Sequence, residues 1–117
     1  MNEQGVVDFT FLQVYAAGNS TLMKNFIQSF LDKTPLALQQ IETHLSTRDF
    51  HSLSGTAHQL KPQLSYMGIK SAHEIIAGIE DAAKNEIGTE NIAPALNSLK
   101  EILESAYAEL KSKLNEL

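Results

Sequence analysis

The sequence predicts an all-α protein, an antiparallel up-down four-helix bundle with a short additional N-terminal helix. Along four long segments, apolar residues recur at intervals of three and four, which is the spacing of one face of an α-helix. Short stretches rich in Gly, Asn, Asp, Ser and Thr separate these segments and predict tight turns. No stretch alternates as a β-strand does, and the hydrophobic fraction of 43% is sufficient for a core.

Length and composition narrow the class of protein. The 117 residues fit one domain, which we place over residues 1–117 with a loose start at residues 1–7. There is no cysteine, no sign of a signal peptide, and no apolar run near the roughly 20 residues that span a bilayer, so we expect a cytoplasmic protein. The net charge of −5 disfavours nucleic acid and anionic membranes as partners.

The first two expected helices lie before residue 47. Asp8 can cap the short first helix, and Gly18 ends it. One of residues 19–21 then caps a long helix that contains Pro35. Because the apolar phase passes Pro35 without a slip, we predict one kinked helix there rather than two helices.

The third expected helix runs from about Asp49 to Tyr66, ahead of Gly68, a typical C-terminal glycine. His58 lies about 100° around the helix from the apolar face, on a line of polar or small residues. We therefore expect His58 to be exposed in the middle of this helix. Pro62 removes the N–H that would bond to the carbonyl of His58, so we expect a kink nearby. The apolar face comprises Phe50, Leu53, Ala57, Leu60, Leu64 and Met67.

Two further helices complete the expected bundle. One runs from about Ser71 to Asn85, and the last runs from about Asn91 to near the C-terminus, with Pro94 tolerated in its first turn. The apolar face of the last helix is close to a heptad repeat. We expect a monomer, with dimerisation through this helix as the weaker alternative.

Residues 57–68, AHQLKPQLSYMG, resemble the phosphoacceptor motif of histidine-containing phosphotransfer (HPt) domains, commonly A-H-x-L-K-G-x-x-x-x-x-G. Pro62 departs from this motif, because the family usually has Gly there. A four-helix pattern of matching order surrounds the motif, so the resemblance covers nearly the whole chain. The residues that match in place are Ala57, His58, Leu60, Lys61 and Gly68.

The resemblance implies a histidine phosphotransfer module of a multistep two-component phosphorelay. His58 would accept a phosphoryl group from a receiver-domain aspartyl phosphate and pass it to another receiver. The implied partners are response-regulator receiver domains and a hybrid sensor histidine kinase. The chain lacks a G-x-x-x-x-G-K-[ST] loop, so we expect a phosphoryl carrier without an ATP site or independent catalytic activity. It would need no cofactor of its own, since the Mg²⁺ is expected on the receiver.

Lys61 lies three residues after His58 on the same helical face, where its ammonium group could offset phosphate charge. The resemblance also implies that Glu80 could accept a hydrogen bond from one imidazole N–H, leaving the other nitrogen free for attack. The alternative for Glu80 is an ordinary solvated side chain. Gly55 leaves room beside the ring or marks a close helix–helix contact. The residues assigned to partner binding are Gly55, Gln59, Pro62 and Ser65.

Two other functions need to be considered. His44, His51 and His58 are spaced seven apart, which on one helix is about 10.5 Å along the axis and too far to share a metal ion. We therefore predict no metal site. The alternative to phosphotransfer is an HPt-like helical bundle that binds receiver domains without transferring phosphate, and the departure at Pro62 leaves this open.

Overall fold

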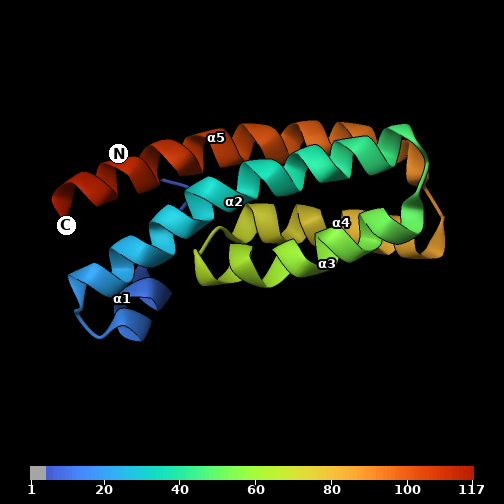
Figure 1. Cartoon of the computed structure of the whole chain (residues 1–117). Helices are drawn as coiled ribbons and strands as arrows, with labels where there is room; N and C mark the ends of the chain where they lie inside the picture. The colour runs from blue at the N-terminus through green and yellow to red at the C-terminus, as the bar shows by residue number, and fades with distance from the viewer. Residues whose placement is uncertain (1–4) are drawn as a thin grey trace.

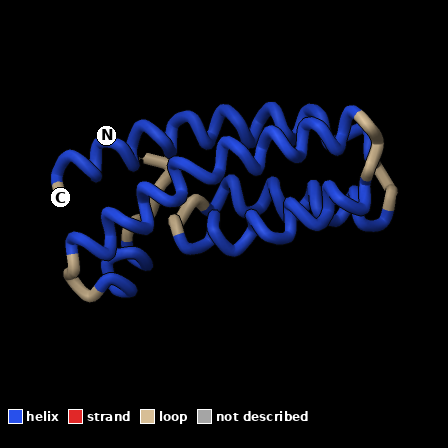
Figure 2. The backbone as a smooth tube through the Cα atoms, viewed as in Figure 1, coloured by secondary structure: helices blue, strands red, loops and turns tan. Residues whose placement is uncertain are grey.

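The computed structural model describes residues 5–117 and is drawn in Figure 1. Its helices are α1 (Thr10–Ala16), α2 (Ser20–Ser46), α3 (Phe50–Tyr66), α4 (Lys70–Asn85), the 3₁₀ helix η1 (Thr89–Asn91) and α5 (Ile92–Glu116). Helices and loops account for all the described residues, and none is in a strand (Figure 2). No helix between residues 5 and 117 has the length and hydropathy needed to cross a membrane.

The four long helices form the predicted bundle. In Figure 1, α2 and α5 lie above α3 and α4, and each long helix packs against two others in the order α2, α3, α4, α5 and back to α2. The short α1 lies at one end of the bundle, beside the start of α2. The all-α, up-down architecture is therefore confirmed.

The core is built from the helical faces that the apolar spacing predicts. Each fully buried Leu or Ile contributes roughly 1.5–3 kcal/mol of hydrophobic free energy. In α3, the buried positions are those that share the predicted face, and the residues beside that face are partly or fully exposed. The packing of α3 against α4 brings together the side chains Leu53, Ala57, Leu60, Leu64, Ala72, Ile76, Ile79 and Ala83 in one cluster.

The helix ends mostly match the expected caps. Asn19 Oδ1 accepts a hydrogen bond from Leu22 N at 3.0 Å, and Asp49 Oδ1 accepts one from Ser52 N at 3.1 Å. Helix α1 begins at Thr10, two residues after Asp8, although the Asp8 carboxylate still accepts a hydrogen bond from the backbone of Thr10.

Both interior prolines lie within continuous helices. Helix α2 continues through Pro35 and α3 continues through Pro62, so the prediction of one long second helix is confirmed. In Figure 1 the N-terminal part of α2 leans away from α5 toward α1, as expected of a helix that contains an interior proline. Helix α1 packs beside this part of α2, and its Phe11 ring stacks on Tyr66 at the end of α3.

A short segment, which we call the N-terminal strap (residues 5–8), ties α1 to the rest of the bundle. Val6 N and Val7 N donate hydrogen bonds to the two carboxylate oxygens of Glu109 in α5, at 2.7 and 3.0 Å. Asp8 N donates to the carbonyl of Gly68, in the turn between α3 and α4, at 2.9 Å. The sequence predicts a loose start over residues 1–7. Residues 1–4 lie outside the described residues, whereas residues 6 and 7 are held by Glu109.

Gly68 is required at this turn for two physical reasons. Its backbone is left-handed, with φ of +69°, a region that disfavours residues with a Cβ atom. A Cβ atom added there would lie 1.9 Å from the carbonyl oxygen of Asp8, far inside van der Waals contact. The strap can approach the turn only because residue 68 has no side chain.

We predict that Gly68→Ala destabilises the fold more than Gly18→Ala. Gly18 is also left-handed, with φ of +78°, but a Cβ atom there would meet nothing within 4 Å. Gly18→Ala should therefore cost only the backbone strain of about 1–2 kcal/mol. Gly68→Ala should cost roughly 1–3 kcal/mol more, because it also collides with the strap. Urea unfolding of both variants measures the difference, and equal losses would show that the strap is not held at this turn.

Candidate functional site

His58 lies in the middle of α3 with its side chain on the surface. The preceding residue, Ala57, is fully buried in the core and fixes the rotation of the helix. The imidazole is 70% exposed, as the sequence predicts for a residue beside the apolar face. A group on another protein can therefore reach the ring without any movement of the bundle.

The imidazole of His58 is hydrogen-bonded to Glu80 of the neighbouring helix α4. His58 Nδ1 lies 2.7 Å from Glu80 Oε2, and the Glu80 side chain is only 12% exposed. A carboxylate can only accept hydrogen bonds, so this contact requires the hydrogen of a neutral imidazole to be on Nδ1. The lone pair is then on Nε2, the nitrogen that does not face Glu80. The sequence left open whether Glu80 is a solvated side chain or a hydrogen-bond partner of the imidazole. In the structure it is buried and hydrogen-bonded to His58.

Lys61 contacts the other oxygen of the same carboxylate. Its Nζ lies 2.7 Å from Glu80 Oε1, in the arrangement of an ion pair rather than of a well-aligned hydrogen bond. The Lys61 side chain is 32% exposed, so its ammonium group sits at the rim between the core and solvent. From the sequence we predict that the Lys61 ammonium group could offset the charge of a phosphate. In the structure this ammonium group forms an ion pair with Glu80.

The two contacts decide the charge of Glu80. Burial alone would raise the pKa of Glu80, because a charged carboxylate is poorly solvated in the protein interior. The contacts with Lys61 and then with His58 outweigh burial, and the net result is a pKa below the ordinary value for a glutamate. Glu80 is therefore ionised at neutral pH. We call His58, Glu80 and Lys61 the acceptor triad.

The four residues assigned to partner binding all lie on the surface of α3. All four are exposed: Gly55, Gln59, Pro62 and Ser65. A Cβ atom at Gly55 would meet nothing within 4 Å, so this glycine leaves open space and does not mark a close helix–helix contact. By helical position, Gly55, Pro62 and Ser65 lie along the same side of α3 as His58, and Gln59 lies about 100° around it.

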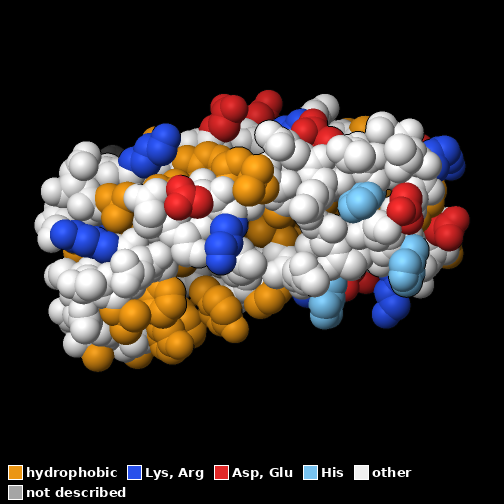
Figure 3. Space-filling model, viewed as in Figure 1, with side chains coloured by type: hydrophobic (Ala, Val, Ile, Leu, Met, Phe, Trp, Pro, Cys, Tyr) orange, Lys and Arg blue, Asp and Glu red, His pale blue; other side chains and the backbone are white. Residues whose placement is uncertain are grey.

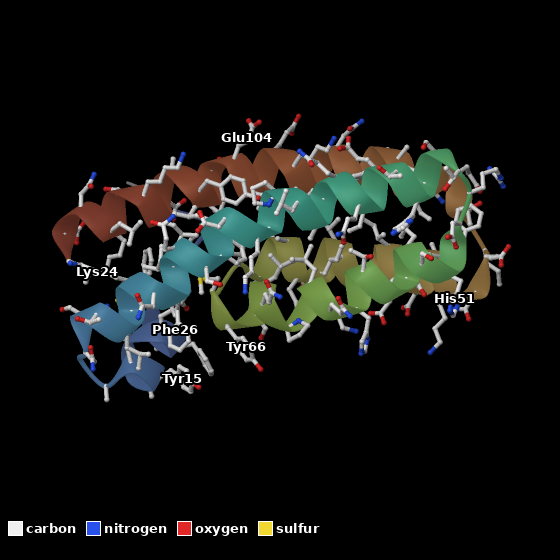
Figure 4. All side chains as sticks on the ribbon, viewed as in Figure 1. Tyr15, Lys24, Phe26, His51, Tyr66 and Glu104 are labelled. Atoms are coloured by element: carbon white, nitrogen blue, oxygen red, sulfur yellow. The ribbon has the colours of Figure 1, made fainter. Side chains whose placement is uncertain are left out.

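The histidines do not gather into a metal site. In residues 5–117, His, Asp and Glu side chains form no group of three that could hold a metal ion. His51 is labelled in Figure 4 near the start of α3, well removed from Tyr66 at its other end. His73 lies in α4, in a helix that carries no second histidine.

A hollow that the sequence analysis missed lies beside the end of α3. We call it the aromatic groove; its volume is about 350 Å³. Phe11 stacks on Tyr66 with ring centroids 5.4 Å apart, and Tyr15 contacts Phe26 at 5.1 Å. Figure 3 shows the hydrophobic side chains gathered at this end, and Figure 4 labels three of the rings. The residues lining the groove are Phe11, Leu12, Tyr15, Phe26, Ser29, Phe30, Gln63, Tyr66 and Met67.

The groove is hard to find from sequence because three helices contribute to it. Phe11 and Tyr15 are four residues apart on α1, and their side chains are 45% and 60% exposed. The available signal in the sequence was the pair of aromatic residues four apart in a short N-terminal helix. Tyr66 follows His58 by eight residues on α3, which is about 12 Å along the helix axis. The groove and the acceptor triad therefore share α3 and lie about two helical turns apart.

Comparisons with known proteins agree with this architecture. The crystal structure of the HPT domain from an Hpt sensor hybrid histidine kinase of Shewanella superposes with a TM-score of 0.80 and 23% sequence identity, covering 96% of each chain. At this identity the likeness shows a shared fold. A search of curated proteins gives no significant match. The model of the Hpt domain family matches residues 25–115, which include His58, Lys61 and Glu80. The chain belongs to the Hpt domain family.

Proposed function

We propose that this protein is the phosphoryl carrier of a multistep phosphorelay, with His58 as the acceptor. It would take the phosphoryl group from the aspartyl phosphate of one receiver domain and deliver it to the aspartate of another. The observation that carries this proposal is the 2.7 Å contact between a buried, ionised Glu80 and Nδ1 of an exposed histidine. Membership of the Hpt domain family supports a role in two-component signalling, and the proposal adds the residue and the attacking atom.

The chemistry follows from the tautomer that Glu80 selects. The Nε2 lone pair attacks the phosphorus of the aspartyl phosphate, the N–P bond forms, and the P–O bond to the aspartate breaks. The leaving group is the receiver's carboxylate. The phosphorylated ring keeps the hydrogen on Nδ1 and so gains positive charge, which the Glu80 carboxylate stabilises. Delivery to a second receiver is the same step in reverse, and we place the Mg²⁺ on the receiver.

The aromatic groove supports a protein as the phosphoryl donor. Large exposed apolar patches commonly mark protein interaction sites, and aromatic side chains often dominate binding energy. A standard interface covers about 800 Å² of each partner, enough to include both His58 and a groove about 12 Å along the same helix. We therefore propose that a receiver domain covers the exposed face of α3 and the groove together. A monomeric, cytoplasmic protein fits this proposal.

Binding without phosphotransfer is the second candidate, favoured by Pro62, whose ring occupies space on the side of α3 that carries His58. The groove would serve this function equally well. The two functions differ in whether a covalent phosphohistidine forms.

Phosphate transfer from a panel of phosphorylated receiver domains tests the main proposal. We expect label that is acid-labile and base-stable, and we expect it to disappear in His58→Gln. His51→Gln is the matched control, because His51 is an exposed histidine on the same helix, and it should retain the label. Label that persists in His58→Gln would refute the assignment. Binding without label from any receiver would favour the docking-only function.

Replacing Glu80 by Ala should slow transfer by roughly 10- to 100-fold. This is the rate equivalent of losing one hydrogen bond to a charged group, about 1.5–3 kcal/mol. Asp81→Ala is the control, since Asp81 is the next residue on α4 and is exposed. Single-turnover transfer at saturating receiver measures the chemical step. An unchanged rate in Glu80→Ala would remove Glu80 from the site.

Replacing Tyr66 or Phe11 by Ala should weaken receiver binding at least about fivefold, as expected for an aromatic side chain central to an interface. Transfer within the saturated complex should change much less, because neither ring belongs to the acceptor triad. Ile87→Ala removes an exposed apolar side chain at the opposite end of the bundle and serves as the control. Calorimetric titration gives the dissociation constants, and equal effects at Ile87 and Tyr66 would argue against docking at the groove.

A further inference from the structure

We propose that Glu109 is a positioning residue for the aromatic groove. By holding the N-terminal strap, its carboxylate would fix the rotation of α1 and therefore the place of the Phe11 and Tyr15 rings. Glu109 lies on α5 and does not line the groove. Figure 1 draws α5 and α1 on opposite sides of α2, so Glu109 acts across the bundle. Its effect on receiver binding rests on the proposed docking at the groove, whereas its effect on α1 does not.

Helix α1 depends on contacts outside itself. It has seven residues, whereas isolated helices shorter than about 12–15 residues are marginal in water. Its N-cap residue, Phe9, forms no side-chain cap hydrogen bond. The buried side chains of α1 are Leu12 and Ala16, which are four residues apart and so lie on one line along the helix. Contacts along a single line hold α1 on the bundle but oppose its rotation about that line only weakly.

The rotation of α1 decides the shape of the groove. Phe11 and Tyr15 share a second line along α1, about 100° around the helix from the buried line. Their rings belong to a chain of four that spans three helices. Phe11 lies 5.4 Å from Tyr66 of α3 and 5.8 Å from Tyr15, and Tyr15 lies 5.1 Å from Phe26 of α2, measured between ring centroids. A rotation of α1 would carry its two rings away from the walls that α2 and α3 supply.

The strap gives α1 its second restraint. Val6 N and Val7 N each donate to a different oxygen of the Glu109 carboxylate, at 2.7 and 3.0 Å. Hydrogen bonds to a charged acceptor are roughly twice as strong as those between neutral groups. Val7 is three residues before Thr10, where α1 begins, so a strap held at Glu109 leaves the helix little freedom to turn.

The fit between the strap and Glu109 is close. A Cβ atom added at Gly5 would lie 2.1 Å from Glu109 Oε1, so the carboxylate can sit against the strap only because residue 5 has no side chain. The backbone of residues 6–8 donates three hydrogen bonds, and Glu109 accepts two of them; Gly68 accepts the third, from Asp8 N. Glu109 is therefore the main polar anchor of the strap.

The first test compares Glu109→Ala with Glu104→Ala in the free protein. Both changes remove one acidic side chain from α5, but Glu104 is exposed and is labelled on the upper surface in Figure 4. Amide hydrogen exchange reports the opening of α1, and the NMR contact between the Phe11 and Tyr66 rings reports the groove. In Glu109→Ala we expect the α1 amides to exchange at least about tenfold faster and the ring contact to weaken, with α3 and α4 unchanged. Glu104→Ala should change neither.

Receiver binding separates positioning from a general loss of stability. Glu109→Ala should raise the dissociation constant of a receiver about threefold to fivefold, while single-turnover transfer at saturating receiver stays unchanged. Glu109→Gln keeps one acceptor oxygen and should recover part of the binding. Ile76→Val is the control for stability, because it removes a buried methyl group from the packing of α3 against α4 and leaves the strap intact. It should not alter receiver binding.

Two results would overturn the inference. One is a Glu109→Ala protein in which α1 exchanges as in Glu104→Ala and the rings of Phe11 and Tyr66 stay in contact. The other is an equal acceleration of exchange in α1, α3 and α4, which would make Glu109 a stabiliser of the whole bundle. If Glu109→Ala does not fold, Gly5→Ala decides instead, because its added Cβ displaces the carboxylate from the strap without altering α5.

Failure of this inference can be told apart from failure of the proposed function. The exchange of α1 and the contact between the rings are measured without a receiver. If α1 loosens in Glu109→Ala but receiver binding is unchanged, Glu109 positions α1 and the proposed docking at the groove fails. If the unaltered protein accepts no phosphoryl group from any receiver, the proposed function fails, and the exchange of α1 still decides the role of Glu109.

Discussion

The buried Glu80 carboxylate is the constraint on which the candidate site depends. An ionised group with so little exposure is tolerated only where partners replace its hydration, and both partners come from the facing helix α3. The apolar packing of α3 against α4 sets the relative position of the two helices, which must bring residues 58 and 61 opposite residue 80. The core packing between α3 and α4 therefore also sets the geometry of the site. A shift of either helix would separate the Glu80 carboxylate from His58 and Lys61.

The periodicity of the sequence was sufficient for the fold. The apolar face of α3, the caps Asn19 and Asp49, and the exposure of His58 all follow from local spacing. The partner of His58 does not, because Glu80 is 22 residues away and meets it only through the packing of two helices. The family resemblance, not the spacing, placed Glu80 near the ring. The same limit explains why the Lys61–Glu80 pair and the aromatic groove were missed.

His58 and the aromatic groove lie at different points along α3. His58 projects from an exposed face, as a side chain must if it meets a reactive group carried by another protein. The concave, aromatic surface lies further along α3, where α1 and the start of α2 supply its other walls. The histidine itself lies on an open surface and lines no part of the groove.

Helix α1 contributes to the groove but not to the acceptor triad. The residues matched by the family model begin at position 25, so they include the acceptor triad but neither the strap nor α1. Phe11 and Tyr15, two of the exposed rings of the groove, lie on α1, which is held by the buried side chains of Leu12 and Ala16 and by the strap bonded to Glu109 and Gly68. A substitution in α1 would therefore change one wall of the groove without touching His58, Lys61 or Glu80, so the surface that we propose for docking can vary separately from the proposed acceptor.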